Sequence, residues 1–172
     1  GVPTREPMLA EGKVDSVTGF SFSSYLNLVK LGVPEEDIST ILMADYGLKL
    51  YGNAIIVNTD FAKENAATVK AFLAAVAAGW KDAILDPKMA VASLIKRNPA
   101  ADASLEERRL MLAVDANVLT NNVKANGMGL VDAERLKEAV AQLGETYEYK
   151  NKPDVNLYFT NKYLPNGGFS LN

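Results

Sequence analysis

The sequence contains no cysteine and no histidine among its 172 residues. Without cysteine, the chain can form no disulfide, no thiolate nucleophile and no cysteine-ligated metal site. Without histidine, it lacks the side chain that most often acts as a general base near neutral pH and most often binds metals. Any catalysis would have to use carboxylates, lysine or tyrosine. The absence of cysteine is compatible with both the cytoplasm and the periplasm.

Blocks of positive charge and long apolar runs are also absent. The formal net charge is -3, and no cluster of lysine and arginine favours a nucleic acid or an anionic membrane as a partner. The longest apolar run is too short and too rich in alanine to span a bilayer, and no segment reads as a signal peptide. The chain begins with Gly1 rather than methionine, so we expect a processed or truncated product.

Hydrophobic residues make up 48% of the chain and charged residues 23%, which is typical of a globular protein. Apolar spacing and capping residues predict several helices. Asp86 followed by Pro87 is expected to open one of them, Ser104 with Glu107 the next, and Asp132 the last, which Gly144 is expected to end. The helices are predicted near residues 5–12, 23–32, 65–86, 88–97, 104–121 and 133–143.

Three shorter apolar segments predict strands, at residues 14–18, 38–43 and 53–58. The last segment, "NAIIVN", has the β-branched content of a buried strand. The order is β-α-β, then a crossing, then one strand followed by several helices. We therefore predict an α/β fold with a helix-rich second part. The residues 166–172 are expected to form a loose tail.

Two loops carry the residue types of a binding site. In "TGFSFSS", Thr18, Gly19, Phe20 and Ser21 stand where a strand is expected to pass into a helix, and free amides and hydroxyls there can bind an anion or a polar ligand. A plain turn with serine as the helix N-cap is the alternative interpretation.

The second loop, "MADYGLKLYGN", spans residues 43–53 and contains Asp45, Tyr46, Tyr51 and Asn53. These side chains either line a pocket or hinge, or belong to a solvated loop whose rings cover the core. Glycines 47 and 52 suit either interpretation. The run "EERR" at 106–109 is interpreted as an exposed helix face, and "NGMG" at 126–129 as a turn. Since no carboxylate cluster has metal-ligand spacing, no metal and no cofactor are expected.

Three stretches together resemble one family: "REPMLAEGKVDSVTGFSFSSYLNL", "ADYGLKLYGNAIIVN" and "ATVKAFLAAVAAGWKDAILDP". They are similar to the periplasmic substrate-binding proteins of ABC importers. The nearest branch serves nitrate, sulfonates, taurine and thiamine-pyrimidine precursors. The resemblance runs from about Thr4 to Pro165. It rests on a helix, "G-x-V-D-x-x-T-G-F", a hinge-like "D-Y-G-x-x-x-Y-G-N" and a helix ending in Asp-Pro.

The resemblance implies the C-terminal half of a two-lobed fold of the periplasmic-binding-protein type II class. Residues 1–43 would belong to the second lobe, 44–53 to the hinge crossover, and 54–165 to a mostly helical return to the first lobe. Family members carry an additional N-terminal half. We therefore expect a fragment, a half supplied by another polypeptide, or an intertwined or swapped homodimer.

The implied function is that of a non-catalytic periplasmic protein that captures a small solute and delivers it to a membrane permease. Aromatic rings would sandwich a flat heteroaromatic solute, and polar groups would bind its donors and acceptors. An aspartate beside the ligand, with no arginine next to these motifs, favours a pyrimidine precursor of thiamine over a nitrate or sulfonate anion. The expected site residues are Thr18, Gly19, Phe20, Ser21, Asp45, Tyr46, Tyr51 and Asn53.

Two other functions compete with solute transport. Fungal relatives of this family make the thiamine pyrimidine, and the resemblance implies a histidine and a cysteine-rich motif for that chemistry. This chain has neither residue type, so an enzyme is not expected. A ligand-sensing domain of a larger signalling protein is the other alternative, because such domains share the fold of binding proteins.

Overall fold

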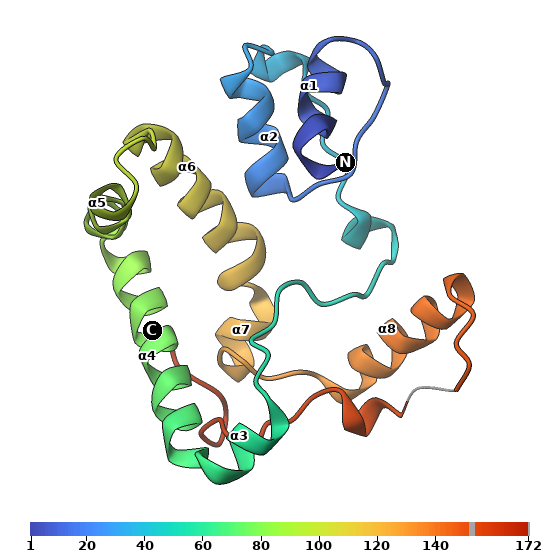
Figure 1. Ribbon diagram of the computed structural model, residues 1–172, viewed down its shortest axis with the longest axis vertical. Coiled ribbons are helices and arrows are strands. Elements are labelled where there is room, and N and C mark those ends of the chain that lie inside the picture. Colours follow the sequence, from blue (N-terminus) through green and yellow to red (C-terminus); the bar gives the residue numbers. More distant parts are fainter. Residues whose placement is uncertain (152–153, 172) are drawn as a thin grey trace. The chain divides into compact units, whose positions relative to one another are not determined.

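The computed structural model describes residues 1–151 and 154–171. Within these residues the chain consists of helices joined by turns and extended segments (Figure 1). An isolated antiparallel bridge between Met128 and Phe169 is the β-structure of the described chain. Internal contacts divide the chain into two compact units: unit 1 is Gly1–Leu42 with Asp86–Ala116, and unit 2 is Met43–Leu85 with Asn117–Asn172.

Unit 1 packs α2 against both α1 and α6, and α5 against α6. Its buried apolar residues are Leu26 and Leu28 from α2, Val91 from α5 and Val114 just after α6. Burial of these side chains stabilises the unit by roughly 1.5–3 kcal/mol each. The elements are η1 (Val2–Thr4), α1 (Arg5–Ala10), α2 (Ser21–Lys30), η2 (Glu35–Asp37), α5 (Pro87–Arg97), α6 (Ala103–Ala113) and a π-helical turn at Val114–Val118 that continues past the unit boundary.

Unit 2 has a small core formed by Ala62, Val69 and Tyr163, with Leu73 packed against it. The hydroxyl of Tyr163 donates a hydrogen bond to the carbonyl oxygen of Ala62 at 3.1 Å, so the buried phenol is satisfied. The elements are η3 (Met43–Tyr46), α3 (Thr59–Glu64), α4 (Ala66–Leu85), α7 (Asn121–Asn126), α8 (Ala133–Thr146) and η5 (Val155–Leu157).

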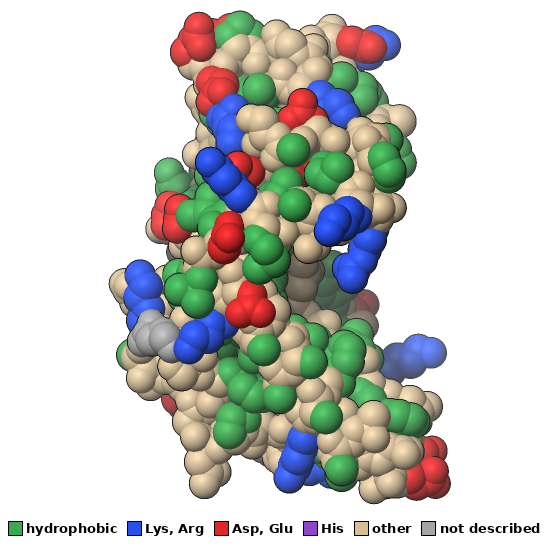
Figure 2. Space-filling view, turned by 90° about the vertical axis from the view of Figure 1, so that its left-hand side faces the viewer, with side chains coloured by type: hydrophobic (Ala, Val, Ile, Leu, Met, Phe, Trp, Pro, Cys, Tyr) green, Lys and Arg blue, Asp and Glu red, His purple; other side chains and the backbone are tan. Residues whose placement is uncertain are grey.

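Helix α4 buries little of its apolar surface. Over its 20 residues, Val69 and Ala77 are buried, whereas Phe72 and Leu85 are more than half exposed. The apolar spacing predicted this helix correctly although little of that surface is buried. The helix forms because the segment contains many alanines, and alanine is the best helix former. Figure 2 shows hydrophobic side chains interspersed with charged ones on the side of the structure that carries α4. No helix of the described chain is long and apolar enough to cross a membrane.

Local capping signals placed most helix starts correctly. The Asp86 carboxylate accepts a hydrogen bond from the Met89 amide at 3.0 Å, with Pro87 in the first helical position, as predicted. Asp132 likewise caps α8. The cap of α6 was predicted wrongly, because Asp102, not Ser104, accepts from the amide three residues on. Asp102 stands two residues before Ser104, and an aspartate caps a helix as well as a serine does.

The predicted helix ends are less accurate. Gly144 does not end α8, which continues to Thr146. A glycine in a helix interior lowers helix stability without breaking the hydrogen-bond pattern. Helix α6 ends at Ala113 and passes into the π-helical turn, short of the predicted residue 121.

Of the tail 166–172 that was predicted to be loose, residues 167–171 make contacts with the rest of unit 2, and Asn172 lies outside the described residues. Met128 and Phe169 exchange two backbone hydrogen bonds, of 2.8 and 2.9 Å, and Leu171 is buried. Gly127 has a positive φ of +85°, and a Cβ there would lie 2.1 Å from the carbonyl oxygen of Gly167. The turn predicted for "NGMG" therefore crosses the turn at Gly167 and Gly168 more closely than side chains would allow.

The three strand predictions are wrong for this chain. Residues 14–18, 38–42 and 53–57 form no β-ladder, and Met43 belongs to the 3-10 turn η3. A strand exists only when its backbone pairs with another strand, and no described segment pairs with these. The β-branched residues of the third segment, expected to be buried, are exposed, Ile56 to 92%.

Candidate functional site

The first predicted ligand loop, residues 18–21, lies at the start of α2 in unit 1. Phe20 is the N-cap residue, with extended backbone angles and no side-chain cap. Its carbonyl oxygen accepts from the amides of Ser23 and Ser24, both at 2.9 Å. The turn therefore lacks the serine N-cap of the plain-turn interpretation, and the first two amides of α2 have no backbone acceptor among the described residues.

Arg5 brings a guanidinium group to this loop. Its Nη1 donates to the carbonyl oxygen of Thr18 and, at 3.3 Å, to the Thr18 hydroxyl. Its Nε is buried and has no hydrogen-bond partner in the described structure. A guanidinium that contacts the loop, and free amides at the start of the helix that follows it, each favour a negatively charged group of a ligand. Reasoning from the sequence missed this arginine, because it stands in α1, 13 residues before Thr18.

The loop rests on a second polar contact. A Cβ at Gly19 would lie 1.9 Å from Ser24 Oγ, so only glycine fits there. Ser24 Oγ in turn donates to Glu6 Oε1 at 2.6 Å, and Glu6 is only 8% exposed. The Ser24 hydrogen bond is the main cause that lowers the pKa of Glu6 below its ordinary value, aided by a hydrogen bond from its own backbone amide and by the charge of Arg5.

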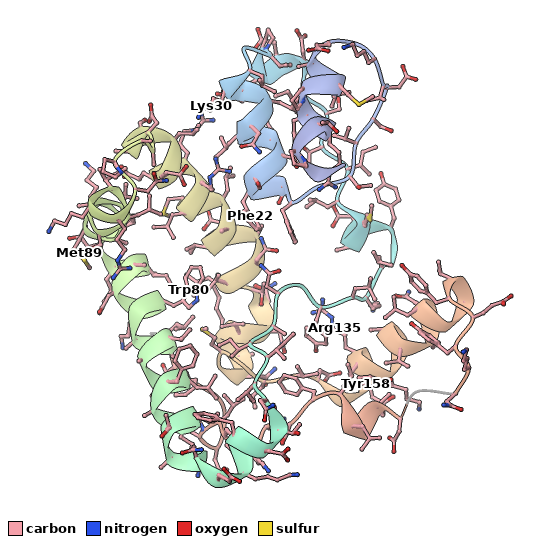
Figure 3. The ribbon with its side chains drawn as sticks, in the orientation of Figure 1. Phe22, Lys30, Trp80, Met89, Arg135 and Tyr158 are labelled. Carbon is pink, nitrogen blue, oxygen red and sulfur yellow. The ribbon has the colours of Figure 1, made fainter. Side chains whose placement is uncertain are left out.

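Aromatic surface is also present at this loop. The ring of Phe20 is 52% exposed and stacks on Phe22, with ring centroids 5.2 Å apart and an angle of 19° between the planes. Figure 3 labels Phe22 at the start of α2. The exposed Phe20 ring, stacked on the partly buried Phe22, offers a flat apolar face to a planar ligand.

A second arginine contacts the first turn of α2. Arg109 Nη1 donates to the carbonyl oxygens of Phe22 and Ser23, at 3.2 and 3.4 Å, while its Nε pairs with Glu106 at 3.1 Å. The Arg109 side chain is 23% exposed and the Glu106 side chain 20%, so interpreting the "EERR" run as an exposed face was wrong at these two residues. Spacing within α6 could not show that one face packs on α2.

Arg108, the other arginine of that run, belongs to a surface network. Its Nη2 donates to Glu35 Oε2 at 2.9 Å, and the Tyr25 hydroxyl donates to the same oxygen at 2.6 Å. The Arg108 hydrogen bond, followed by that of Tyr25, lowers the pKa of Glu35. The hydrogen bond to Glu35 raises the pKa of Tyr25. These contacts join α6 to α2 and η2. Each of the three titratable groups, Tyr25, Glu35 and Arg108, is engaged by a hydrogen bond to another of them.

The second predicted loop lies in unit 2, where some of its side chains are exposed and Tyr51 is bound by α8. Asp45 and Tyr46 belong to the 3-10 turn η3, and Tyr46 is 78% exposed. Asn53 is also exposed. None of these three side chains has a hydrogen-bond partner within residues 1–151 and 154–171. They are available to a ligand, but no described side chain or backbone group of unit 2 holds them by a hydrogen bond.

Tyr51 is held firmly against α8. Its hydroxyl oxygen accepts a hydrogen bond from the amide of Asp132 at 2.9 Å. The guanidinium of Arg135 lies 4.3 Å from the centre of the Tyr51 ring and donates to the carbonyl oxygens of Lys49 and Leu50, at 3.1 and 3.0 Å. Figure 3 shows Arg135 extending from α8 toward the extended segment. Tyr51 therefore anchors the loop rather than standing free to stack on a solute.

Gln142 completes the attachment of this loop. Its Oε1 accepts from the Lys49 amide at 2.9 Å, and its Nε2 donates to the Gly47 carbonyl oxygen at 2.8 Å. The amide side chain thus satisfies one donor and one acceptor of the extended backbone, as a neighbouring strand would. Residues 47–51 are bound along α8 by side chains that lie more than 80 residues away in the sequence.

A pocket in unit 2 is lined by none of the expected site residues. It has a volume of about 700 Å³ and is lined by α7, by the turn that follows it and by residues 166–171. Its polar lining includes Asn122, Lys124, Asn126, Asp132 and Asn166. The described residues contain no group of three acidic, histidine or cysteine side chains that could hold a metal ion.

The predicted site residues are divided between the two units. Residues 18–21 lie in unit 1, and Asp45, Tyr46, Tyr51 and Asn53 lie in unit 2. Their joining into one ligand site stays a prediction, as does the assignment of chain segments to two lobes.

Comparison with known proteins places the chain in a family of substrate-binding proteins, whose members have the type II periplasmic-binding-protein fold. The matching family model is described as NMT1/THI5 like and covers residues 2–90. Because this is more than half of the chain, the protein belongs to the NMT1/THI5-like family. No curated protein and no solved structure matches it.

Membership supports several statements at the level of the family. Its members bind small solutes for ABC-type transporters, are generally not enzymes and are typically extracytoplasmic. The resemblance to the branch for nitrate, sulfonates and thiamine precursors is confirmed. The match includes both predicted ligand loops and ends within α5, so the resemblance beyond residue 90 stays a prediction.

Proposed function

We propose that this protein is the periplasmic solute-binding component of an ABC importer, which captures a small solute and delivers it to a membrane permease. Family membership supports the general role. Both loops with ligand-binding chemistry lie inside the matched residues. The role needs polar groups and rings held in place rather than a nucleophile, which suits a chain without cysteine or histidine.

The contact between Arg5 and Thr18 supports a solute with an anionic group, such as a sulfonate or nitrate. The preference for a neutral or cationic ring depended on there being no arginine beside the two motifs. Arg5 contacts Thr18 in the first of them, and the first two amides of the helix that follows, α2, lack a backbone acceptor. A guanidinium and helix amides together favour an anion by charge-assisted hydrogen bonds.

A flat heteroaromatic solute, such as a thiamine-pyrimidine precursor, is the second candidate. The exposed Phe20 ring, stacked on Phe22, supports it. So does the exposed ring of Tyr46 in the second loop. Stacking on such rings requires neither charge nor a metal.

The test is isothermal calorimetry and thermal shift with nitrate, taurine, an alkanesulfonate and an aminopyrimidine. We expect the anions to bind and Arg5→Gln to weaken them about tenfold or more, since hydrogen bonds to charged groups are worth roughly 1.5–3 kcal/mol. Arg97→Gln is the matched control, because Arg97 is exposed at the end of α5 in the same unit.

The outcomes separate the two candidates. Binding of the aminopyrimidine alone, unaffected by Arg5→Gln, would replace the anion with the ring compound. If none of the four compounds bound to the wild-type protein, the proposal of solute capture in this branch would fail. The melting temperature of each variant without solute shows whether a loss of binding reflects a loss of folding.

A further inference from the structure

Residues 54–57 form an extended segment of unit 2 whose backbone is unpaired. None of their amides or carbonyl oxygens makes a hydrogen bond in the described structure. Ile55 and Ile56 are more than half exposed, and Ile56 reaches 92%. Exposed β-branched side chains on an unpaired extended backbone are the features of a strand edge that accepts another strand.

The segment is held at both ends within unit 2. Before it, the Leu50 carbonyl oxygen accepts from Arg135, and the Tyr51 hydroxyl accepts from the Asp132 amide. After it, the Asn58 side chain accepts from the amides of Asp60 and Phe61 and so caps α3. Because its two ends are fixed, the segment loses less conformational entropy when a partner strand binds. Figure 1 shows it as an extended stretch before α3.

We propose that this segment pairs with the same segment of a second copy of the chain, antiparallel about a two-fold axis. The sequence of 53–58 is Asn-Ala-Ile-Ile-Val-Asn and contains no charge, although charged residues make up 23% of the chain. Two-fold pairing brings identical segments together, so any charge in the segment would meet its own like charge. A segment without charge can therefore pair with its own copy without repulsion between like charges.

The register that fits best is centred on Ile56. It places Ile56 opposite its own copy and Ile55 opposite the partner's Val57, so that three consecutive pairs are β-branched on both sides. A register centred between Ile55 and Ile56 would instead place Ala54 opposite Val57 and leave space beside the alanine. Pairing over so few residues buries far less than the roughly 1,200–2,000 Å² of a stable interface, so the dimer is weak and depends on concentration.

Single cysteines test this register, because the chain has none of its own. Opposite residues of antiparallel strands have Cα atoms about 4.5–5.5 Å apart, which is within disulfide reach. Under mild oxidation at about 100 μM, where a weak dimer is populated, Ile56→Cys should form a covalent dimer. Ile55→Cys should cross-link much less, because its own copy lies diagonally across the pair. Leu157→Cys, at a residue 82% exposed in the same unit, should not cross-link.

Sedimentation velocity tests the association itself. The wild-type protein should show a sedimentation coefficient that rises with concentration, and Ile56→Lys should remove this rise. Leu157→Lys is the matched control and should keep it. Since the Ile56 side chain is almost fully exposed, the circular dichroism spectrum of Ile56→Lys should remain that of the wild type.

Three results would overturn the proposal. A monomeric wild type at all concentrations would exclude a second copy and leave a strand of a different polypeptide as the occupant. A dimer that persists in Ile56→Lys would place the interface on another surface. Faster cross-linking of Ile55→Cys than of Ile56→Cys would overturn the register. Since none of these measurements uses a solute, failure here is distinct from failure of the solute-binding proposal.

Discussion

Glu6 and Ser24 form the most enclosed polar contact beneath the first ligand loop. Because the pKa of Glu6 is lowered in the folded state, its contribution to stability is present above the ordinary value of 4.5 and is lost as pH falls through the folded pKa. Ser24→Ala should therefore lower the free energy of unfolding by about 1–3 kcal/mol at pH 7 and by less at pH 3.

Urea unfolding at the two pH values measures this difference. Ser93→Ala is the control, since Ser93 Oγ donates only to the Met89 carbonyl oxygen of its own exposed helix turn. An equal loss of stability at both pH values would contradict a role for the Glu6 charge.

Single residues also show where sequence reasoning succeeds and where it fails. Asp86 and Asp132 were identified as caps because their partners lie three residues away. Arg5 and Arg135 were missed because their partners lie 13 and more than 80 residues away. Residue types predicted polar loops, but only the fold shows that Tyr51 is engaged by α8 while Tyr46 is free.

At the scale of elements, helices were predictable and strands were not. The hydrogen bonds of a helix join residues four apart, so spacing and caps are sufficient to locate α2, α4 and α5. The pairing of a strand depends on a second segment, which residue pattern alone cannot supply. The apolar residues of 38–42 and 53–57 have the composition of strands but remain unpaired in the described chain.

The attachment of residues 47–51 to α8 gives a prediction at this scale. Gln142→Ala removes the partner of the Lys49 amide and of the Gly47 carbonyl oxygen, so the segment should open more often. We expect amide hydrogen exchange at residues 47–51 to rise about tenfold, which corresponds to the loss of about 1.4 kcal/mol. Lys137→Ala is the control on the same helix, because Lys137 is exposed and pairs only with Glu134. Unchanged exchange in Gln142→Ala would show that Arg135 and Tyr51 alone hold the segment.

At the scale of the whole molecule, each compact unit combines two segments that are distant in the sequence. Leu26 is fully buried in unit 1, so Leu26→Ala should cost about 2–5 kcal/mol there. Amide exchange should then rise in residues 1–42 and also in 86–116, although 43 intervening residues belong to unit 2. Tyr163→Phe is the counterpart in unit 2, since it removes the hydrogen bond to Ala62 and should raise exchange in α3. If amide exchange rose equally in all four segments in both variants, the division into two units would be contradicted. The chain would then open as a single cooperative unit.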